Sequence, residues 1–437
     1  MRFKNKKILV YGLGKSGLAV IERLIRLKAK IFLLDTNKKV LDKIASSYDL
    51  STEFDISSLD MIIVSPAIAK NDAVLEQAKM SKIKIISELE FGFLLNKKAT
   101  YISVTGTNGK TTTVNIIYNI LKSSGKNSYL LGNVGTPLSS ATIKKGIVAL
   151  EVSSFQLEYI DKFRPQIAII LNLAPDHLNR YTSLSEYYSY KKKIIQNSKN
   201  DILILNKDDN NLKNFNPQNT KVYYISLNKF DGKGAFIFDG KICYHDKSTE
   251  EICDIKDLKL IGIHNLYNIM ASVVACKLMG IYNETIKTAI TQFSGLAHRF
   301  EFVLENNGVI VINDSKSTNV ASTLSAYKST TSGSHIILGG SSKGECFDAL
   351  FSEKPKYHFY LYGETAKEIY ATAKKYNQQK KCTIFDNLFD ATNYALSKAK
   401  RGEMVVLSPA CASYDAFVSY EDRGEQFKEY VRTYYEK

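Results

Sequence analysis

Residues 101–113 read Tyr-Ile-Ser-Val-Thr-Gly-Thr-Asn-Gly-Lys-Thr-Thr-Thr, an apolar run followed by a glycine-rich loop. An amphipathic stretch over residues 114–121 comes next, so the pattern predicts a strand, a tight loop and a helix. This arrangement turns backbone N–H groups and a helix N-terminus toward an anion. Lys110 can reach terminal phosphate oxygens and the Thr111 hydroxyl can ligate Mg²⁺, so the stretch predicts a nucleoside triphosphate site.

The spacing of the loop glycines is unusual. A standard phosphate loop has four residues between its two glycines, whereas only Thr107 and Asn108 separate Gly106 from Gly109 here. Val104 stands where the first glycine of the standard loop would lie. The loop is therefore a variant, and such a variant indicates a particular family of nucleotide-binding proteins.

The bulk composition is that of an ordinary folded chain. Its 437 residues predict two or three domains, with 44% hydrophobic and 24% charged residues. No apolar run is long enough to span a bilayer, and the first residues lack the apolar core of a signal peptide. The six cysteines include no C-x-x-C pair, which argues against a zinc site and favours a reducing compartment. We therefore expect a cytoplasmic protein that does not bind a membrane.

The net charge of +15 raises the hypothesis of a nucleic-acid partner. The basic residues are mostly lysines spread along the whole chain, and runs such as residues 191–193 are short and isolated. A compositional bias toward Lys, Asn, Ile and Tyr accounts for the same charge. We therefore expect no nucleic-acid partner, although the positive surface could help to recruit an anionic substrate.

The N-terminal segment has the pattern of a dinucleotide-binding unit. A strand-like run at residues 8–11 precedes the glycine-rich stretch Gly12-Leu13-Gly14-Lys15-Ser16-Gly17. A helical stretch and a second strand follow, ending at Asp35. By itself, G-x-G-x-x-G is a weak signal that would also fit an NAD-dependent oxidoreductase. The second nucleotide loop downstream favours instead an enzyme that uses ATP and binds a nucleotide-tagged substrate.

Polar residues follow two of the predicted central strands. Glu151 ends the first of them, and Asp176 and His177 come after the second. In an open parallel sheet the carboxyl ends of the strands form the ligand-binding edge. Glu151 would complete the Mg²⁺ coordination begun by Thr111, and His177 is a candidate for a ligand or substrate contact.

Strand and helix patterns alternate again after residue 295, as they do in the two preceding segments. We therefore predict an α/β fold of three domains. A Rossmann-like domain covers residues 1–93, a central ATPase-like phosphate-loop domain covers residues 94–294, and a second Rossmann-like domain covers residues 295–437. Short alternating runs over residues 220–260 predict a small antiparallel addition to the central domain.

Several motifs together identify the family that the chain resembles. The loop at residues 106–112 and the stretch Gly-Ile-His-Asn-Leu-Tyr-Asn at residues 262–268 are similar to those of the Mur ligases. These are the ATP-dependent amino-acid ligases of peptidoglycan precursor synthesis. Residues 313–319, 338–343 and 407–415 resemble the members of the family that add D-glutamate. The resemblance runs from the first strand to the C-terminus.

The resemblance implies a monomeric ligase that joins D-glutamate to UDP-N-acetylmuramoyl-L-alanine through an acyl-phosphate intermediate, with ATP converted to ADP and phosphate. Two Mg²⁺ ions are expected. A ligase of the same fold that uses another amino acid is a close alternative. The NAD-dependent oxidoreductase and a basic, nucleotide-gated nucleic-acid binder are the alternatives from other classes.

The resemblance also implies roles for individual residues. The catalytic residues would be Lys110, His177 and Lys192, and the metal ligands would be Thr111, Glu151, His177 and Lys192. The residues implied in ATP binding are Gly106, Thr107, Asn108, Gly109, Lys110, Thr111, Thr112, Asn265, Asn268, Arg299 and Asp314. Those implied in holding the UDP-substrate are Gly14, Lys15, Ser16, Gly17, Asp35, Thr36, Ser65, Asn133, Ser153 and Gln156. D-Glutamate would be bound by Lys316, Thr318, Lys343, Ser413 and Tyr420.

Lys192 lies fifteen residues after His177, at a position where lysines of the family are carbamylated by CO₂. A free ammonium has no lone pair and cannot bind Mg²⁺, whereas a carbamate supplies an anionic oxygen suited to a hard cation. The resemblance therefore implies a carbamylated Lys192. The alternative from the residues alone is a solvated basic run at residues 191–193.

The chain departs from the family at two positions. Tyr420 stands where Phe is common, and Ala67 stands where Gly usually follows Ser65 and Pro66. The family uses the backbone at the first position, so we expect Tyr420 to be tolerated. Ala67 would resist a left-handed backbone conformation in its loop, because only Gly adopts positive φ without steric cost.

Overall fold

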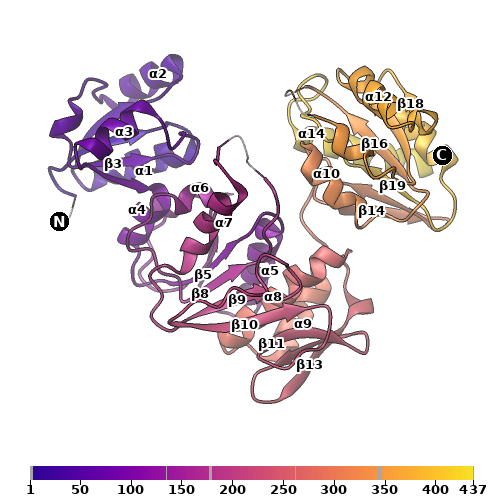
Figure 1. Cartoon of the computed structure of the whole chain (residues 1–437), viewed down its shortest axis with the longest axis horizontal. Coiled ribbons are helices and arrows are strands. Elements are labelled where there is room, and N and C mark those ends of the chain that lie inside the picture. The colour runs from indigo at the N-terminus through magenta and orange to yellow at the C-terminus, as the bar shows by residue number, and fades with distance from the viewer. Residues whose placement is uncertain are drawn as a thin grey trace. The chain divides into compact units, whose positions relative to one another are not determined.

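The computed structural model describes residues 3–133, 135–176, 180–260, 262–342, 344 and 346–436. Three β-sheets with flanking helices follow one another along the chain (Figure 1). They divide between two compact units, the first comprising Met1–Asp257 and Leu266–Ile290 and the second Leu258–Asn265 and Thr291–Lys437. The predicted α/β class with three domains is confirmed, whereas the domain bounds at residues 93 and 294 stay predictions.

The N-terminal sheet consists of the parallel strands β1 (Lys7–Tyr11), β2 (Lys30–Leu34), β3 (Met61–Val64) and β4 (Lys84–Ser87). Its helices are α1 (Lys15–Arg26), α2 (Lys38–Tyr48) and α3 (Ala73–Met80). The strand order β2-β1-β3-β4 reverses direction at β1. The glycine-rich loop after β1 therefore opens at a topological switch point, where α/β sheets bind ligands.

Helix α4 (Glu88–Leu95) joins the N-terminal sheet to the central sheet. The Glu90 carboxylate on this helix is fully buried and accepts hydrogen bonds from the backbone N–H groups of residues 161–163 at 2.9–3.0 Å. Phe93 packs edge-on against Phe163, with ring centroids 5.4 Å apart. These buried contacts help to hold the two sheets in one compact unit.

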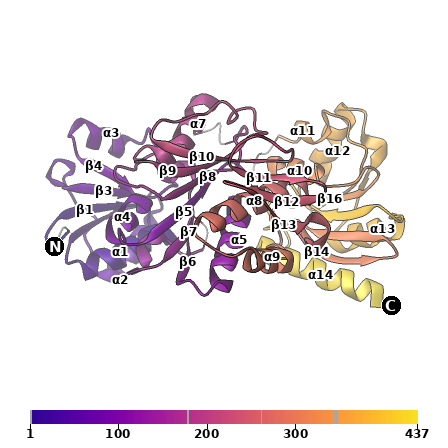
Figure 2. The same cartoon turned by 90° about the horizontal axis from the view of Figure 1, so that it is seen from below.

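The central sheet has nine strands within the described ranges. Their order is β13 (Thr249–Asp254), β12 (Lys241–His245), β11 (Gly234–Phe238), β10 (Thr220–Ser226), β9 (Asp201–Asn206), β8 (Ile167–Ile170), β5 (Thr100–Thr105), β7 (Ile147–Glu151) and β6 (Ser128–Gly132). The helices are α5 (Lys110–Ser123), α6 (Ser154–Leu157), α7 (Leu184–Lys192), α8 (Ile263–Leu278) and α9 (Asn283–Gln292). Helix α5 packs on one face of the sheet, and helix α7 lies on the other (Figure 2).

The predicted antiparallel addition over residues 220–260 is wrong for its first strand. β10 pairs in parallel with β9 and β11, and antiparallel pairing begins between β11 and β12. The connection over residues 207–219 is long enough for the crossover that a parallel pair requires. Alternation of apolar residues along β10 did not distinguish the two pairings, because both give a period of two.

The C-terminal sheet has the order β14 (Glu301–Asn306), β15 (Val309–Asn313), β19 (Met404–Leu407), β16 (His335–Gly339), β17 (His358–Tyr362) and β18 (Cys382–Ile384). β14 is antiparallel to β15, and the other pairs are parallel. The helices are α10 (Val320–Tyr327), α11 (Asp348–Phe351), α12 (Ala366–Lys375), α13 (Leu388–Lys398) and α14 (Tyr420–Glu436). Because β19 lies between β15 and β16, the loops after these three strands share one edge.

The remaining helical segments are short 3₁₀ turns at Ile56–Ser58, Leu138–Ser140, Lys193–Ile195, Ile255–Asp257 and Gln379–Lys381. Across the part of the chain that the structure describes, no helix combines the length and the apolar character needed to cross a membrane.

Candidate active site

The predicted phosphate loop connects β5 to α5. Gly106 and Gly109 have φ values of +149° and +85°, which non-glycine residues rarely adopt. The Lys110 ammonium donates to the carbonyl oxygens of Gly106 and Thr107, at 2.9 and 2.8 Å. Thr111 and Thr112, half-buried, follow in the first turn of α5. The helix N-terminus, the lysine and the hydroxyl groups therefore converge on the loop, as anion binding requires.

Two asparagines brace the phosphate loop. The Asn172 side chain accepts from the backbone N–H of Asn108 at 2.8 Å and donates to its carbonyl oxygen at 3.0 Å. A Cβ at Gly109 would come within 2.3 Å of Oδ1 of Asn268. The Thr113 hydroxyl donates to the same Oδ1 at 3.2 Å. Asn268, which we expected to bind ATP, thus packs directly against the loop.

Lys191 is the lysine that the structure brings to the phosphate loop. Its side chain is 2% exposed, and its ammonium donates to the Gly106 carbonyl at 2.8 Å. One helical turn earlier, the Tyr187 hydroxyl lies 3.4 Å from Oγ1 of Thr107. Burial, and secondarily the charge of Lys110, lower the pKa of Lys191 well below its usual range. Lys191 therefore loses its proton to give the neutral amine far more readily than a surface lysine does.

Lys192 points elsewhere. Its ammonium lies over the Phe215 ring, 4.6 Å from the centroid, and its side chain is half-buried. Successive residues of a helix point about 100° apart, so only one of the two neighbours can face the loop. The structure thus brings Lys191, and not the predicted Lys192, to the phosphate loop. The i, i+4 spacing of Tyr187 and Lys191 is the sequence signal that would have indicated this.

Glu151 ends β7 beside the phosphate loop, paired across from Val104 of β5. It is 2% exposed, and its Oε1 accepts a long hydrogen bond of 3.4 Å from Asn133. Within the described residues, its Oε2 is buried without a hydrogen-bond partner. An orphaned buried carboxylate oxygen is costly unless a ligand satisfies it. Glu151 and the Thr111 hydroxyl therefore fit a hard cation such as Mg²⁺.

His177, the remaining predicted metal ligand, lies outside the described residues, as does Lys343. Across the residues that are described, no three His, Cys, Asp or Glu side chains stand close enough to hold a metal ion. Among the described residues, Glu151 and Thr111 at the edge of the sheet therefore remain the groups that could hold a metal ion.

The N-terminal glycine loop has the geometry of a phosphate site. Gly14 precedes α1, and no side chain caps this helix N-terminus. A Cβ at Gly17 would lie 2.1 Å from the Gly12 carbonyl oxygen, so only glycine fits. Lys15 is exposed and Ser16 half-buried beside this N-terminus. Its N–H groups are therefore available for an anion.

Asp35 has a structural role in this loop. Its carboxylate accepts from the backbone N–H of Leu13 at 2.6 Å and from that of Asn37 at 2.8 Å. Thr36 beside it is exposed, and Ser65 lies half-buried against the glycine loop. Asp35 therefore fixes the glycine loop itself, in addition to any contact with a nucleotide.

Ser153 and Gln156, which we expected to contact the UDP-substrate, form a capping box at the start of α6. The Gln156 backbone N–H donates to Oγ of Ser153 at 3.3 Å, and the Ser153 backbone N–H donates to Oε1 of Gln156 at 3.0 Å.

Ala67 does not have a positive φ. The replacement of Gly by Ala at this position therefore carries no backbone strain.

Asp314 follows β15 in the second unit. Ser317 and Ser408 donate hydroxyl hydrogen bonds to its Oδ2 at 2.5 and 2.8 Å, and the Phe300 N–H donates to Oδ1 at 3.0 Å. Burial raises the pKa of Asp314 to about 6. The half-buried Arg299 lies between two residues in the left-handed region, His298 at φ +63° and Phe300 at +45°. Such strain often marks functional loops.

Asn265, the other asparagine expected to bind ATP, is buried, and its backbone N–H donates to the Gly262 carbonyl at 2.9 Å. It belongs to the second unit, whereas Asn268 belongs to the first. The boundary between the units therefore falls within the first turn of α8.

The residues expected to bind D-glutamate gather at the edge of the C-terminal sheet. The Lys316 ammonium lies 3.6 Å from the centroid of the Tyr420 ring. Ser413 is buried on the loop after β19, and the Thr318 N–H donates to the Lys316 carbonyl at 2.8 Å. Four of the five predicted residues are thus described here, on two loops and the start of α14.

Arg423 holds these loops together, and sequence reasoning missed it. The guanidinium is completely buried and donates to Ser315 Oγ, Ser315 O, Ala412 O, Cys411 O and Tyr362 OH at 2.9–3.4 Å. Arg423 lies on the same i, i+4, i+8 stripe of α14 as the buried Phe427 and Val431. An arginine on an apolar stripe is the signal that could have found it.

Family comparison covers nearly the whole chain. Residues 6–87 match the Mur ligase MurD-like N-terminal domain, residues 104–276 the Mur ligase middle domain, and residues 298–411 the Mur ligase glutamate ligase domain. The chain is 37% identical to the UDP-N-acetylmuramoylalanine--D-glutamate ligase of Thermoanaerobacter pseudethanolicus over 99% of both chains. It is 35% identical to the protein of the same name from Clostridioides difficile, again over 99% of both.

Solved structures share the fold at lower identity. MurF ligase from Thermotoga maritima in complex with ADP is 17% identical with a TM-score of 0.58, covering 99% of this chain and 96% of that chain. UDP-N-acetylmuramate-alanine ligase MurC from the same organism is 17% identical with a TM-score of 0.57, covering 98% and 99%. Fold, phosphate loop and relatives together define a multidomain α/β ligase. The chain belongs to the Mur ligase family.

Proposed function

We propose that the chain joins D-glutamate to UDP-N-acetylmuramoyl-L-alanine, with ATP converted to ADP and phosphate, in peptidoglycan precursor synthesis. Mur ligases as a family depend on ATP and Mg²⁺. The observation that carries the proposal is the similarity over the full length to two D-glutamate ligases. The phosphate loop, with buried Glu151 and Lys191 beside it, supports the ATP-dependent step.

The reaction needs an activated carboxyl group because a carboxylate is a poor acyl donor at neutral pH. A carboxylate oxygen of the L-alanine residue first attacks the γ-phosphorus of ATP, and the bond from that phosphorus to ADP breaks. The amine of D-glutamate then attacks the carbonyl carbon of the acyl phosphate, and the C–O bond to phosphate breaks. Lys110 would neutralise the negative charge on the transferred phosphoryl group.

We assign Thr111 and Glu151 to the metal site, together with His177 from outside the described residues. Mg²⁺, when bound there, would polarise the phosphoryl oxygens. We place the carbamylated lysine at Lys191, because its burial beside the loop favours the neutral amine that reacts with CO₂. Thr111, Glu151, His177 and the carbamate would be the protein ligands of two Mg²⁺ ions, and phosphate oxygens and water would fill the remaining positions.

The proposed substrate-binding residues are those that the family resemblance implies. The chain would hold UDP through the glycine loop after β1, Asp35, Thr36 and Ser65, with Asn133, Ser153 and Gln156 toward the sugar and peptide. D-Glutamate would meet Lys316, Thr318, Lys343, Ser413 and Tyr420. Asn265, Asn268, Arg299 and Asp314 would complete the ATP site. We further propose a monomeric cytoplasmic enzyme that acts without nucleic acid or membrane.

The test is phosphate release with ATP, Mg²⁺ and UDP-N-acetylmuramoyl-L-alanine across a panel of amino acids. D-Glutamate is expected to support turnover, and L-lysine and diaminopimelate are not. Turnover with either of those two but not with D-glutamate would refute the assignment. Lys110→Ala should abolish phosphate release while leaving the melting temperature unchanged, which separates a loss of chemistry from a loss of fold.

A further inference from the structure

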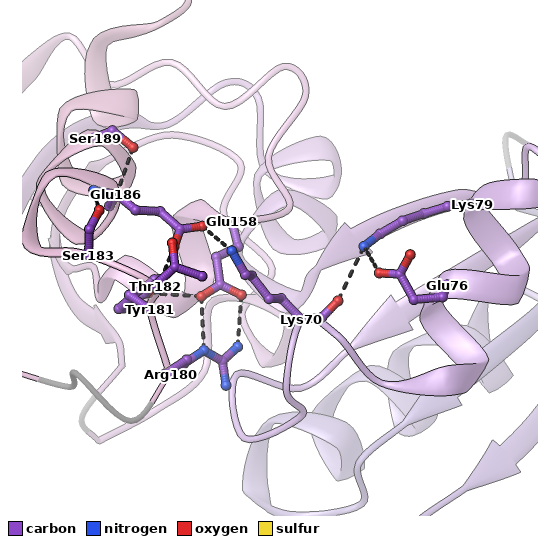
Figure 3. Close-up of polar contacts among 10 residues, drawn as sticks. All are labelled: Lys70, Glu76, Lys79, Glu158, Arg180, Tyr181, Thr182, Ser183, Glu186 and Ser189. Atoms are coloured by element: carbon purple, nitrogen blue, oxygen red, sulfur yellow. Dashed lines mark hydrogen bonds and ion pairs between the residues drawn. The ribbon is translucent and has the colours of Figure 1, made fainter.

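An ion pair links two sheets of the first unit at a place that the proposed mechanism does not use. Lys70 lies on the loop at residues 65–72, between β3 and α3 of the N-terminal sheet. Its ammonium pairs with the carboxylate of Glu186, which lies in the first turn of α7 beside the central sheet (Figure 3). Glu186 also accepts from the backbone N–H and the hydroxyl of Thr182, both at 2.8 Å.

A second, more buried ion pair lies beside the first. The guanidinium of Arg180 donates to both carboxylate oxygens of Glu158, at 2.9 and 2.8 Å, and to the Ile68 carbonyl at 2.8 Å. The Tyr181 hydroxyl donates to Glu158 at 2.8 Å, and the guanidinium stacks on Phe155 with 4.3 Å to the ring centroid. We call the Lys70–Glu186 and Arg180–Glu158 pairs the bridge. The Lys70–Glu186 pair ties the loop after β3 to the first turn of α7, and Arg180, held by Glu158, ties the same loop to the chain leading into α7 through its bond to the Ile68 carbonyl.

Each end of the bridge continues into one of the two nucleotide loops. On the N-terminal side, the Cβ of Ser65 would lie 2.5 Å from a Cβ at Gly12, so the loop after β3 packs directly on the glycine-rich loop. On the central side, Tyr187 and Lys191 of α7 face the phosphate loop. A continuous series of packed groups therefore runs from one nucleotide loop to the other through a single helix.

We propose that the bridge positions helix α7, and with it Lys191, from the loop that borders the uridine-nucleotide site. Lys70 and Glu186 are positioning residues, since they act through α7. This inference rests on the proposed function. The side chains of the pair are 26% and 20% exposed, so the pair should contribute little to stability. The pair would act by holding α7 and Lys191 in position, because a displacement of about 1 Å in an active site can lower the rate on the order of 100-fold.

A double-mutant cycle tests the bridge. Lys70→Met removes the charge but keeps the apolar stem, and Glu186→Gln keeps an acceptor for the Thr182 N–H. For Lys70→Met we expect kcat to fall about fivefold and the KM for UDP-N-acetylmuramoyl-L-alanine to rise about threefold, at an unchanged melting temperature. In the Glu186→Gln background the same substitution should add no further loss. Lys70→Arg should retain activity.

The matched control is Glu76→Ala, which breaks the Lys79–Glu76 pair within α3 (Figure 3). It should leave kcat and KM unchanged. Full activity of Lys70→Met, or equal losses in both backgrounds, would overturn the proposal.

If the wild-type protein releases no phosphate at all, the proposed function fails and the bridge is tested by calorimetry with UDP. Lys70→Met should then weaken UDP binding about threefold in the wild-type background and not in Glu186→Gln. Unchanged UDP affinity of Lys70→Met would overturn the bridge by this route.

Discussion

The carboxyl edges of the central and C-terminal sheets differ in how completely protein hydrogen bonds satisfy their buried charged groups. At the central edge, one oxygen of Glu151 lacks a hydrogen-bond partner among the described residues, and the buried Lys191 ammonium donates to a neutral carbonyl. At the C-terminal edge, Asp314 accepts three hydrogen bonds and Arg423 donates five. Buried charge is costly unless it is satisfied.

The difference separates charged groups whose compensation a ligand would supply from charged groups that hold loops in place. At the central edge the described protein groups satisfy the buried charge incompletely, and bound phosphate and metal would compensate it. Substitutions there should therefore reduce activity more than stability. The satisfied network at the C-terminal edge holds loops in place before any ligand arrives. Substitution of Arg423, which donates most of these bonds, should reduce stability first.

The largest expected effect distinguishes the two neighbouring lysines of α7. Lys191→Ala should lower the rate of phosphate release about 10²–10³-fold, because it removes a buried group at the phosphate loop. Short carboxylic acids should restore part of the activity by supplying an anionic oxygen. Lys192→Ala is the matched control and should stay within about threefold of wild type. The reverse order of the two variants would contradict the placement of the functional lysine.

Arg423 tests the scaffold side of the comparison. Arg423→Met should lower the free energy of unfolding by about 3–5 kcal/mol, because the Ser315, Cys411 and Ala412 oxygens lose their donor. Urea unfolding followed by circular dichroism would measure it. Arg432→Met, at an exposed position of the same helix, should change stability by at most about 0.5 kcal/mol. Equal stability of the two variants would remove the scaffold role.

The pH dependence of stability should report Asp314. Burial raises its folded-state pKa to about 6, above the ordinary 3.8, so the folded protein binds the extra proton between these values. Its contribution to stability should therefore fall as pH rises from 4 to 6, by up to about 3 kcal/mol. Melting temperatures at pH 4.5 and 6.5 would show a larger decrease in wild type than in Asp314→Asn. Parallel curves would contradict the raised pKa.

The smallest effect is expected at Tyr420, where the ring rather than the hydroxyl faces Lys316. Tyr420→Phe should leave the KM for D-glutamate within about twofold, because the cation–π contact of about 0.5–1 kcal/mol persists. Tyr420→Ala removes the ring and should raise that KM several-fold. A large loss in Tyr420→Phe would show that the hydroxyl itself is needed.

Local patterns predicted much of the site. The sequence predicted the strand–loop–helix turn that contains Gly106, Gly109 and Lys110, and it predicted the strand that ends at Glu151. The structure has both features. They could be predicted because each depends on short-range apolar periodicity. Asp35, Ser153 and Gln156 were expected at a ligand, and the structure shows that their side chains bond to backbone groups. Those partners follow from loop geometry, which apolar periodicity does not contain.

The amino-acid sequence by itself determined the α/β class, the order of the three sheets and the position of the phosphate loop. These features depend on local apolar periodicity and on the backbone freedom of glycine. Only the tertiary structure decided that Lys191 rather than Lys192 faces that loop, and that Arg423 ties the C-terminal loops together. The direction of a helical side chain depends on where its helix begins and on what it packs against, and both are set by residues distant in the chain.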